Sequence, residues 1–532
     1  MRAMSRVGAI VAAGLFALLP MRGPAAQPAE RPLRLVMNTE LQVLDPHVSP
    51  SYVTRTFGFM VFDQLVAMDS QGNMRPQMLE SWQASEDRLT WTFRLRPGLE
   101  WHDGTPVTAE DCIASIRRWG TNDGLGRQMM AAMREMRAID QNTFVLELAR
   151  PFSQVIEALG KPSPYVAFMM PARLAAQPPN RPMAEIMGSG PFVFRRDEWR
   201  SGDRVVFRRN PRYRPRSEAA DGLAGGKVVH FERTEFVSLP DPSMRATALQ
   251  AGEVDYLEYA PLDYVERYQR DRNLVVMPRP GLSQIMGAML INNIQPPFNN
   301  LAARRALLLA VNQAEVVAGL GLPRDMTMPF CPTIYSCGSP FETDAGAAHL
   351  RDWNLDRARA ALRESGYNNE RVVVLHSADS ALISPVTLVL AEQMRRTGFN
   401  VDLVSQDFST LAQRRLSREP VERGGWSIMP VIWAGYDLAN PLANYATAYN
   451  CSNNYPGWYC DRELTPLLEA FAAEADPTRQ REIAQRIQVR VLDNPGIIFA
   501  GQFSAPAVHR ANLRGVLPGG FPILWNIRRE GR

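Results

Sequence analysis

The amino-acid sequence predicts an α/β protein with mixed sheets in more than one lobe. Short runs with the two-residue periodicity of half-buried strands alternate with helical stretches along all 532 residues. At about 150 residues per domain, this length allows roughly three or four domains. No internal repeat and no low-complexity linker divides the sequence, so we expect the lobes to pack together.

Strands and one capped helix are predicted in the first half of the chain. Alternating apolar residues predict strands at 33–37, 89–95, 144–148 and 192–194. Thr108 followed by Asp111 is a capping-box arrangement, which indicates the start of a helix. The segment from Gly188 to Pro191 is glycine-rich but too short to hold a phosphate, and it is predicted to be a tight turn before a strand.

Helices with clear start and stop residues are predicted in the second half. They run from Asn354 to Gly366, from Ser384 to Gly398 and from Asp476 to Asn494. A further helix is predicted by the apolar stripe Leu307, Ala310, Val311, Ala314 and Val317.

Composition excludes several classes of protein. Charged residues make up 21% and hydrophobic residues 45% of the chain, which argues against a disordered or collagen-like protein. The formal net charge is only +4 and no run of five basic residues occurs, so no nucleic-acid partner is expected.

The first 26 residues have the pattern of a secretory signal peptide. Arg2 and Arg6 supply positive charge, an uncharged apolar stretch covers residues 7–19, and small residues follow through Ala26. This stretch is too short for a bilayer core about 30 Å thick, which needs about 20 residues, so a membrane anchor is not expected. We predict export, with cleavage near Ala25 or Ala26.

The cysteine spacing fits an exported protein. Cys331 and Cys337 are separated by five residues, and Cys451 and Cys460 by eight, each pair in a loop rich in Pro, Gly, Asn or Ser. Such pairs usually form disulfides in an oxidising compartment. Zinc binding is the alternative, but no Cys-x-x-Cys and no neighbouring histidine supports it. Cys112 is predicted to be a small buried apolar residue.

The sequence lacks the motifs of common enzyme sites. There is no Gly-x-Ser-x-Gly, His-Glu-x-x-His, Gly-x-Gly-x-x-Gly or Walker motif. The six histidines are scattered without the spacing of metal ligands. We therefore expect no catalysis, no metal and no cofactor.

One segment is rich in aromatic residues and poor in acids. It contains Trp426, Trp433, Tyr436, Tyr445, Tyr449, Tyr455 and Trp458. Asp437 is the only acidic residue between Glu422 and Asp461. Aromatic residues line ligand pockets, and a carboxylate among them is suited to hold an ammonium group. The alternative is that these aromatics pack in the core and Asp437 lies in a turn before Asn440 and Pro441.

A set of short segments is spread along the chain, at 61–66, Pro76, 80–82, 89–98, 101–106, 108–111, 188–192, 202–203, 209–213, 296–298 and 304–306. Together they resemble the extracytoplasmic solute-binding proteins of ABC importers, in the family 5 group of oligopeptide and dipeptide receptors. The stretch from Leu89 to Asp111 is specific on its own, whereas each of the others alone is weak. The resemblance runs from about Leu33 to the C-terminus.

The resemblance implies a two-lobe periplasmic-binding-protein (Venus-flytrap) fold with mixed sheets and an additional domain. The expected parts are the signal peptide at 1–26, lobe I at 30–60, 190–282 and 497–532, the additional domain at 61–189, and lobe II at 283–496. Members of this family close around a ligand by a hinge and dock on a membrane permease. We expect a periplasmic monomer that works with an ABC permease at the inner membrane.

The resemblance also implies the site residues. Peptide receptors of this family bind the ligand's amino group with an aspartate shortly after a tryptophan, and the segment from Trp433 to Pro441 is similar. It departs from the pattern because Tyr436 is inserted before the aspartate and Asn440 replaces an acid. The arginine with which dipeptide receptors bind the ligand carboxylate has no counterpart in residues 377–383.

We therefore expect Asp437 to bind an ammonium group. Trp433 and Tyr436 are expected to form the wall of the cleft, with Glu40 and Tyr52 on its floor. The loop closed by Cys451 and Cys460 resembles the family's disulfide loop near the cleft.

The expected function is capture of a peptide or peptide-like amine for an ABC importer. The same fold binding an opine, a sugar or a metal chelate is the nearest alternative. A secreted hydrolase with an unrecognised site, or an exported chaperone or sensor-coupled receptor, are alternatives of other classes.

Overall fold

The computed structural model describes residues 31–452 and 455–530. The predicted signal peptide lies outside the described residues. The chain from Pro32 onward forms one compact unit. Within the described ranges, no helix has the length and apolar character that crossing a membrane requires.

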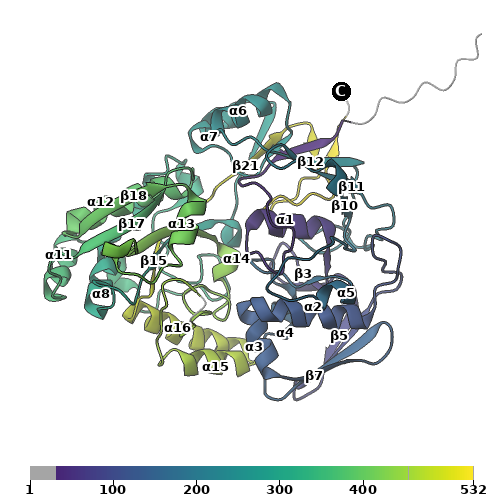
Figure 1. The fold of residues 1–532 in the computed structure, drawn as a ribbon, viewed down its shortest axis with the longest axis horizontal. Helices are drawn as coiled ribbons and strands as arrows, with labels where there is room; N and C mark the ends of the chain where they lie inside the picture. Colours follow the sequence, from purple (N-terminus) through teal and green to yellow (C-terminus); the bar gives the residue numbers. More distant parts are fainter. Residues whose placement is uncertain (1–30, 453–454, 531–532) are drawn as a thin grey trace, which may run out of the picture. The chain divides into compact units, whose positions relative to one another are not determined.

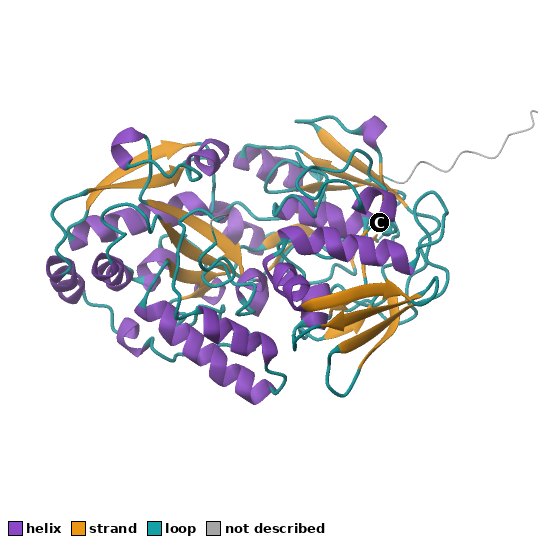
Figure 2. Ribbon diagram, turned by 60° about the horizontal axis from the view of Figure 1, so that its bottom comes forward, coloured by secondary structure: helices purple, strands orange, loops and turns teal. Residues whose placement is uncertain are grey.

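The first part of this unit, called lobe I below, is built on a mixed sheet (Figures 1 and 2). In spatial order, its described strands are β10 (Phe192–Phe194), β11 (Arg204–Arg209), β12 (Arg233–Val237), β1 (Leu33–Val36), β13 (Tyr256–Leu257), β21 (Ala507–Arg510) and β14 (Leu274–Met277). Strand β1 runs parallel to both of its neighbours, and the other pairs are antiparallel. The chain leaves this central strand and enters helix α1 (Tyr52–Val61).

The second part, called lobe II, has its own mixed sheet. Its described strands are β16 (Thr327–Met328), β20 (Ile497–Phe503), β15 (Ile285–Ile291), β19 (Ile428–Ala434), β17 (Arg371–Ser377) and β18 (Asn400–Gln406). Strand β17 is parallel to β18 and β19, whereas β15 is antiparallel to β19 and β20. The mixed α/β class predicted from the sequence is confirmed.

Strand β20 lies in lobe II, although residues from 497 onward were expected in lobe I. It pairs with β15 and β16, and the chain reaches the sheet of lobe I only at β21. A short link, residues 504–506, separates these two apolar strands, so the sequence does not reveal that they belong to different sheets. We propose that lobe II extends to Phe503.

A third part, the additional domain, has an antiparallel sheet and a helical layer. Its main strands are β5 (Leu79–Ala84), β6 (Thr90–Leu95), β8 (Thr143–Leu148) and β7 (Met133–Ala138), in that spatial order. Its helices are α2 (Ala109–Asn122), α3 (Gly124–Ala132), α4 (Val155–Gly160) and α5 (Ala172–Ala175). The predicted capping box is confirmed, because Thr108 and Asp111 bond reciprocally at the start of α2.

Shorter paired strands and helices complete the lobes. The pairs are β2 (Asp63–Gln64) with β9 (Phe168–Met169), β3 (Val66–Met68) with β4 (Met74–Pro76), and β22 (Leu513–Arg514) with β23 (Arg528–Arg529). Lobe I also has α6 (Pro242–Ala251) and α7 (Val265–Gln269). Short 3-10 helices lie at Arg196–Glu198, Leu262–Tyr264, Gly281–Ser283, Arg324–Met326 and Val421–Arg423.

Three predicted helices of lobe II are confirmed, namely α11 (Leu355–Glu364), α12 (Ile383–Thr397) and α16 (Pro477–Asp493). The other described helices of this lobe are α8 (Leu301–Ala310), α9 (Gln313–Ala318), α10 (Ala348–Arg351), α13 (Phe408–Arg414), α14 (Gly435–Leu438) and α15 (Thr465–Ala473). The predicted cap residues Asn354 and Asp476 accept backbone hydrogen bonds at the starts of α11 and α16, and Gly398 ends α12 in a left-handed conformation.

The apolar stripe between Leu307 and Val317 does not lie on one helix. Helix α8 ends at Ala310, and α9 begins at Gln313. Asn312 has an extended backbone, and its side chain accepts a hydrogen bond from the Glu315 amide. An asparagine that can cap a new helix therefore interrupts the apolar periodicity.

The turn before β10 requires its glycines. The Gly190 amide donates to the Val61 carbonyl at the end of α1, 2.9 Å away. A Cβ atom on Gly188 would lie 1.9 Å from the same Val61 oxygen. The glycines thus let the chain pass against α1 and enter the predicted strand at Phe192.

Both predicted disulfides are present, and they join Cys331 to Cys337 and Cys451 to Cys460. Cys112 carries a free thiol and is buried in α2, as predicted. The zinc alternative for these cysteines is excluded, because a disulfide sulfur is not a thiolate ligand.

Two segments of the described chain connect lobe I with lobe II. One lies between β14 and β15, and the other lies between β20 and β21. They are hydrogen-bonded to each other, since the Arg279 amide donates to the Ser504 hydroxyl at 2.7 Å. We propose that these two paired connections act as the hinge about which the lobes rotate.

A buried ion pair fastens the additional domain to lobe I. Arg118 of α2 donates to Asp45 Oδ2 at 2.7 Å, and both side chains are at most 1% exposed. The same guanidinium donates to the backbone carbonyls of Gln177, Pro178 and Arg181. Asp45 also accepts hydrogen bonds from the backbone amides of His47 and Met183.

Arg118→Met should lower the free energy of unfolding by roughly 3–5 kcal/mol, because it leaves the Asp45 carboxylate buried without its cation. Arg270→Met is the matched control, because its ion pair with Glu266 lies on the surface, with side chains 79% and 68% exposed. Urea unfolding of both variants tests this. Equal stability of the two variants would contradict a structural role for the Arg118 pair.

Candidate functional site

Asp437 lies at the start of a short helix that directly follows strand β19. The carboxylate side chain is fully buried, with 0% exposure. Gly435 lets the chain turn here, since a Cβ atom at that position would lie 2.6 Å from Ser336 Oγ and 2.8 Å from the Leu282 oxygen. The turn places Asp437 at the edge of lobe II next to α1 of lobe I (Figure 1).

A hydrogen bond joins Asp437 to Tyr52 of lobe I. The Tyr52 hydroxyl donates to Asp437 Oδ2 at 2.5 Å and accepts from the Ala434 amide at 2.8 Å. Burial and the neighbouring Asp437 charge raise the pKa of Tyr52 well above its ordinary value, so the hydroxyl keeps its proton. The sequence-predicted residues Asp437 and Tyr52 are therefore brought together across the two lobes.

Among the described residues, the second oxygen of this carboxylate, Oδ1, makes no hydrogen bond of normal geometry. The Ser163 hydroxyl is close enough to the carboxylate to lower its pKa. Burial raises the pKa of Asp437, while the charge of Arg55, the nearby Ser163 hydroxyl, Tyr52 and Lys161 lower it in part. A buried carboxylate oxygen of this kind needs a cation or a hydrogen-bond donor.

Arg55, one turn after Tyr52 on α1, is a second buried charge at this place. Only 1% of the residue is exposed. Its guanidinium lies 4.5 Å from the Tyr52 ring centroid and 4.1 Å from that of Phe521, and Nη1 donates to Ser163 Oγ at 2.8 Å. Sequence reasoning missed Arg55 and Ser163. The available signal was that Arg55 is the only charged residue in the otherwise uncharged helix Tyr52–Val61.

A cavity of about 730 Å³ lies between the lobes. The four residues described above do not line it, but Pro162, Tyr436 and Phe521, which neighbour them in sequence or in space, do. Its lining comes from lobe I, the additional domain and lobe II, and it includes Tyr436, as expected for a cleft wall. The Tyr436 hydroxyl is hydrogen-bonded to that of Ser283 at 2.9 Å. Asn440 and Gln154 also line this cavity. Asn440 donates to Gln154 Oε1 at 2.8 Å, which is a further contact between lobe II and the additional domain.

Trp433 differs from the expectation that it forms the cleft wall. It is only 7% exposed, and it is not part of the lining of the 730 Å³ cavity. Its ring stacks on Tyr445 with centroids 4.6 Å apart, and Tyr449 and Tyr455 continue the stack. Core packing, the alternative considered for this aromatic segment, describes Trp433 better.

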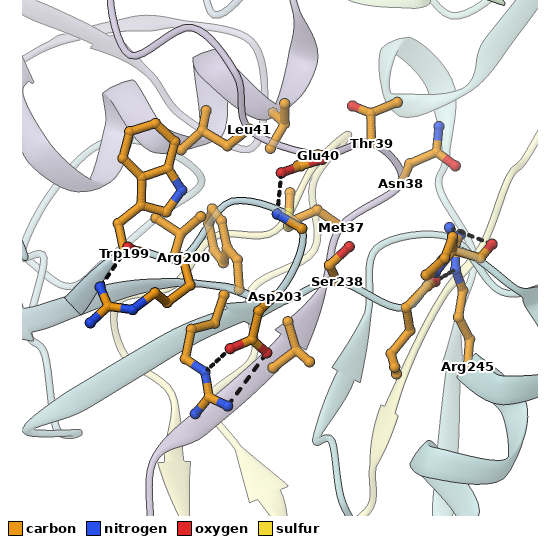
Figure 3. Close-up of a pocket in the computed structure, with 18 residues that line it drawn as sticks. Met37, Asn38, Thr39, Glu40, Leu41, Trp199, Arg200, Asp203, Ser238 and Arg245 are labelled. Carbon is orange, nitrogen blue, oxygen red and sulfur yellow. Dashed lines mark hydrogen bonds and ion pairs between the residues drawn. The ribbon is translucent and has the colours of Figure 1, made fainter. Parts of the chain in front are cut away.

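Glu40 also differs from its expected place on the floor of the cleft. It lines a separate pocket of about 350 Å³ whose residues all come from lobe I (Figure 3). Its Oε1 atom accepts hydrogen bonds from the Gly202 amide at 2.5 Å and the Ser201 hydroxyl at 2.9 Å. The turn between β10 and β11 thus holds the Glu40 carboxylate. The sequence does not reveal this contact, because the two segments are far apart along the chain.

Comparison with known proteins places this arrangement in a family. Residues 73–456 match the model for bacterial extracellular solute-binding proteins, family 5 Middle. The chain is 32% identical, over 99% of both sequences, to a probable peptide ABC transporter periplasmic-binding protein, y4tO, of Sinorhizobium fredii. It is 23% identical, over 92% of both, to the glutathione-binding protein GsiB of Escherichia coli K12.

Solved structures share the fold. The receptor AgaA in complex with agropinic acid, from A. tumefacien R10, superposes with a TM-score of 0.77 and 20% identity over 94% of this chain and 99% of AgaA. The oligopeptide-binding protein AppA of Bacillus subtilis, in complex with a nonapeptide, gives 0.77 and 16% over 95% and 100%. Both are two-lobe binding proteins. The chain therefore belongs to family 5 of the bacterial extracellular solute-binding proteins, as the sequence motifs indicated.

Proposed function

We propose that this protein is the periplasmic receptor of an ABC importer and that it captures peptides or peptide-like amines. Family membership supports the role of a solute receptor. The observation that carries the ligand class is the buried Asp437 carboxylate, which accepts a hydrogen bond from Tyr52 on one oxygen and makes none on the other within the described part of the chain. An ammonium group supplies both the charge and the donors that this oxygen needs.

The ligand would act by contacting both lobes at once. Asp437 belongs to lobe II, whereas Tyr52 and Arg55 belong to lobe I, so the site is complete only when the lobes meet. A ligand that binds the closed form more tightly shifts the population toward that form. The closed form would then dock on the permease in the inner membrane.

Export to the periplasm is supported by three observations. The first 26 residues have the pattern of a signal peptide, and the related protein of Sinorhizobium fredii is named as periplasmic-binding. The two disulfides are typical of an oxidising compartment.

An opine is the second candidate ligand. Its support is the shared fold with the receptor that binds agropinic acid. A thermal-shift screen of peptides, opines and sugars separates these ligand classes, because a saturating ligand raises the stability of the native state.

The surroundings of His376 give little support to the alternative that the protein is a hydrolase. Its two ring nitrogens lie 2.8 Å from the hydroxyls of Ser405 and Ser384. A serine nucleophile requires a base whose other nitrogen is oriented by an acid. In the described part of the chain, no carboxylate is hydrogen-bonded to His376, and both nitrogens contact serines.

Asp437→Asn should weaken binding of the tightest amine ligand from the screen by about ten- to hundredfold, because a charge-assisted hydrogen bond is lost. Isothermal titration calorimetry measures this. Glu40→Gln is the matched control and should bind normally, since Glu40 lies in the separate pocket of lobe I. Unchanged affinity in Asp437→Asn would remove Asp437 from the site.

Affinity for that amine should fall as the pH is lowered from about 7 to about 4. Protonation of Asp437 removes the negative charge that attracts the ammonium group, and burial raises the pKa of Asp437, so the loss begins above the pH at which an exposed aspartate titrates. Calorimetry across this pH range should show the decline in the unmodified protein and a flat profile in Asp437→Asn. The same decline in both proteins would assign it to another group.

A further inference from the structure

We propose that Arg55 binds a carboxylate of the ligand beside Asp437, so that the site selects ligands that carry an amine and a carboxylate on the same carbon atom. This inference rests on the proposed function, because it assumes that Asp437 binds the amine. Free amino acids, γ-glutamyl peptides and opines of the amino-acid type have such a zwitterionic head. The N-terminus of an ordinary α-linked peptide does not, because its α-carboxyl is part of the peptide bond.

The free edge of the Arg55 guanidinium is the first observation. Nη1 donates to Ser163, whereas Nε and Nη2 are buried and, among the described residues, have no hydrogen-bond partner. The Tyr52 and Phe521 rings lie close to this guanidinium, so its N–H groups supply the remaining polar contacts. A buried cation with two unused donors is costly unless an anion meets it.

The Nε–Nη2 edge is the one that this protein uses elsewhere for carboxylates. Arg490 binds Asp461 with Nε at 2.5 Å and Nη2 at 2.8 Å. Arg216 binds Glu218 in the same way, at 3.2 and 2.8 Å. These two parallel hydrogen bonds match the planar geometry of a carboxylate. The unused edge of Arg55 is therefore chemically suited to a carboxylate of the ligand.

No carboxylate of the protein serves Arg55 in this way. In the described ranges, no ion pair joins Arg55 to an acid, although Asp437 is close enough for its pKa to be lowered by Arg55. Lys161, the other nearby cation, is already paired with Asp123 at 2.8 Å. The cluster of Tyr52, Arg55, Ser163 and Asp437 thus presents two guanidinium donors and one carboxylate oxygen that make no hydrogen bond within the described residues. These groups are complementary to the carboxylate and the ammonium group of a zwitterion.

The two protein groups that would bind the ligand's charges share Tyr52 as a neighbour. Tyr52 contacts both protein groups, since its hydroxyl bonds Asp437 and its ring lies 4.5 Å from the Arg55 guanidinium. Opposite termini of a peptide move apart by about 3.3–3.6 Å for each residue added. An amine and a carboxylate on one carbon have the short separation that this geometry requires, whatever the length of the rest of the ligand.

The remainder of the ligand has room in the adjoining cavity of about 730 Å³. Three of its lining residues contact the cluster or directly precede one of its members. Phe521 contacts Arg55, Pro162 precedes Ser163, and Tyr436 precedes Asp437. A side chain or a γ-linked extension can therefore leave the zwitterionic head and enter the cavity.

Two isomeric dipeptides test this proposal without any change to the protein. γ-Glutamylglycine keeps its α-amine and α-carboxylate together, whereas α-glutamylglycine has the same atoms and net charge but an amide beside its amine. We expect calorimetry to show binding of the γ-isomer at least about tenfold tighter, the effect of one charge-assisted contact. Equal affinity, or preference for the α-isomer, would overturn the proposal.

A variant then assigns the preference to Arg55. Arg55→Met should remove the difference between the isomers by weakening only the γ-isomer, about ten- to hundredfold. Arg351→Met is the matched control, because Arg351 also lies over an aromatic ring, that of Phe330 in lobe II, and it should keep the preference. If Arg55→Met weakens both isomers equally, Arg55 has only a structural role and the proposal fails.

The remaining outcomes separate this inference from the proposed function. If α-linked peptides bind, and Asp437→Asn weakens them while Arg55→Met does not, the proposed function stands and the zwitterion selectivity is wrong. If no amine of any kind binds, both are wrong. Circular dichroism of each variant confirms that the loss is not caused by unfolding.

Discussion

The architecture depends on one constraint, which is the burial of the Asp437 carboxylate, away from water, where the two lobes meet. Asp437 has 0% exposure, and the nearest donor, the Tyr52 hydroxyl, comes from the opposite lobe. Desolvation of a carboxylate is costly, so the closed arrangement is favourable only if the buried charge is compensated. Tyr52 donates to one oxygen, and the charges of Arg55 and Lys161 offset part of the cost. We propose that a ligand cation meets the other oxygen, so that the ligand class and the closure of the lobes follow from one electrostatic requirement.

Contacts on both sides of the site hold its residues in place, and we propose that the lobes separate about the two connections between them. On the side of lobe I, the Arg118–Asp45 pair fixes the additional domain to the chain that leads into α1. On the side of lobe II, Gly435 permits the close approach that turns Asp437 out of β19. Between the lobes, the two connections paired by Arg279 and Ser504 supply the hinge. Rigid halves joined by a narrow hinge convert the binding energy of a small ligand into a domain movement.

Local signals predicted much of the fold, because caps, alternation and cysteine spacing depend on neighbouring residues. The capping box at Thr108, the helix that starts after Asp476 and both disulfides are examples. The site was harder to predict. The motif around Asp437 and the position of Tyr52 were identified, but Glu40 is held by the turn at Gly202, and Arg55 was overlooked. Both depend on contacts between segments far apart in sequence, and the sheet to which β20 belongs is determined in the same way. Such pairings follow from tertiary packing, which the periodicity of a sequence does not reveal.

A crystal structure of the protein with its natural ligand, purified from the native host without denaturation, tests the central claim most directly. We expect the lobes closed, with a ligand nitrogen within hydrogen-bonding distance of Asp437 Oδ1 and ligand contacts to both lobes. A ligand that touches a single lobe, or whose nearest atom to Asp437 is not a donor, would contradict the claim that this buried carboxylate selects the ligand.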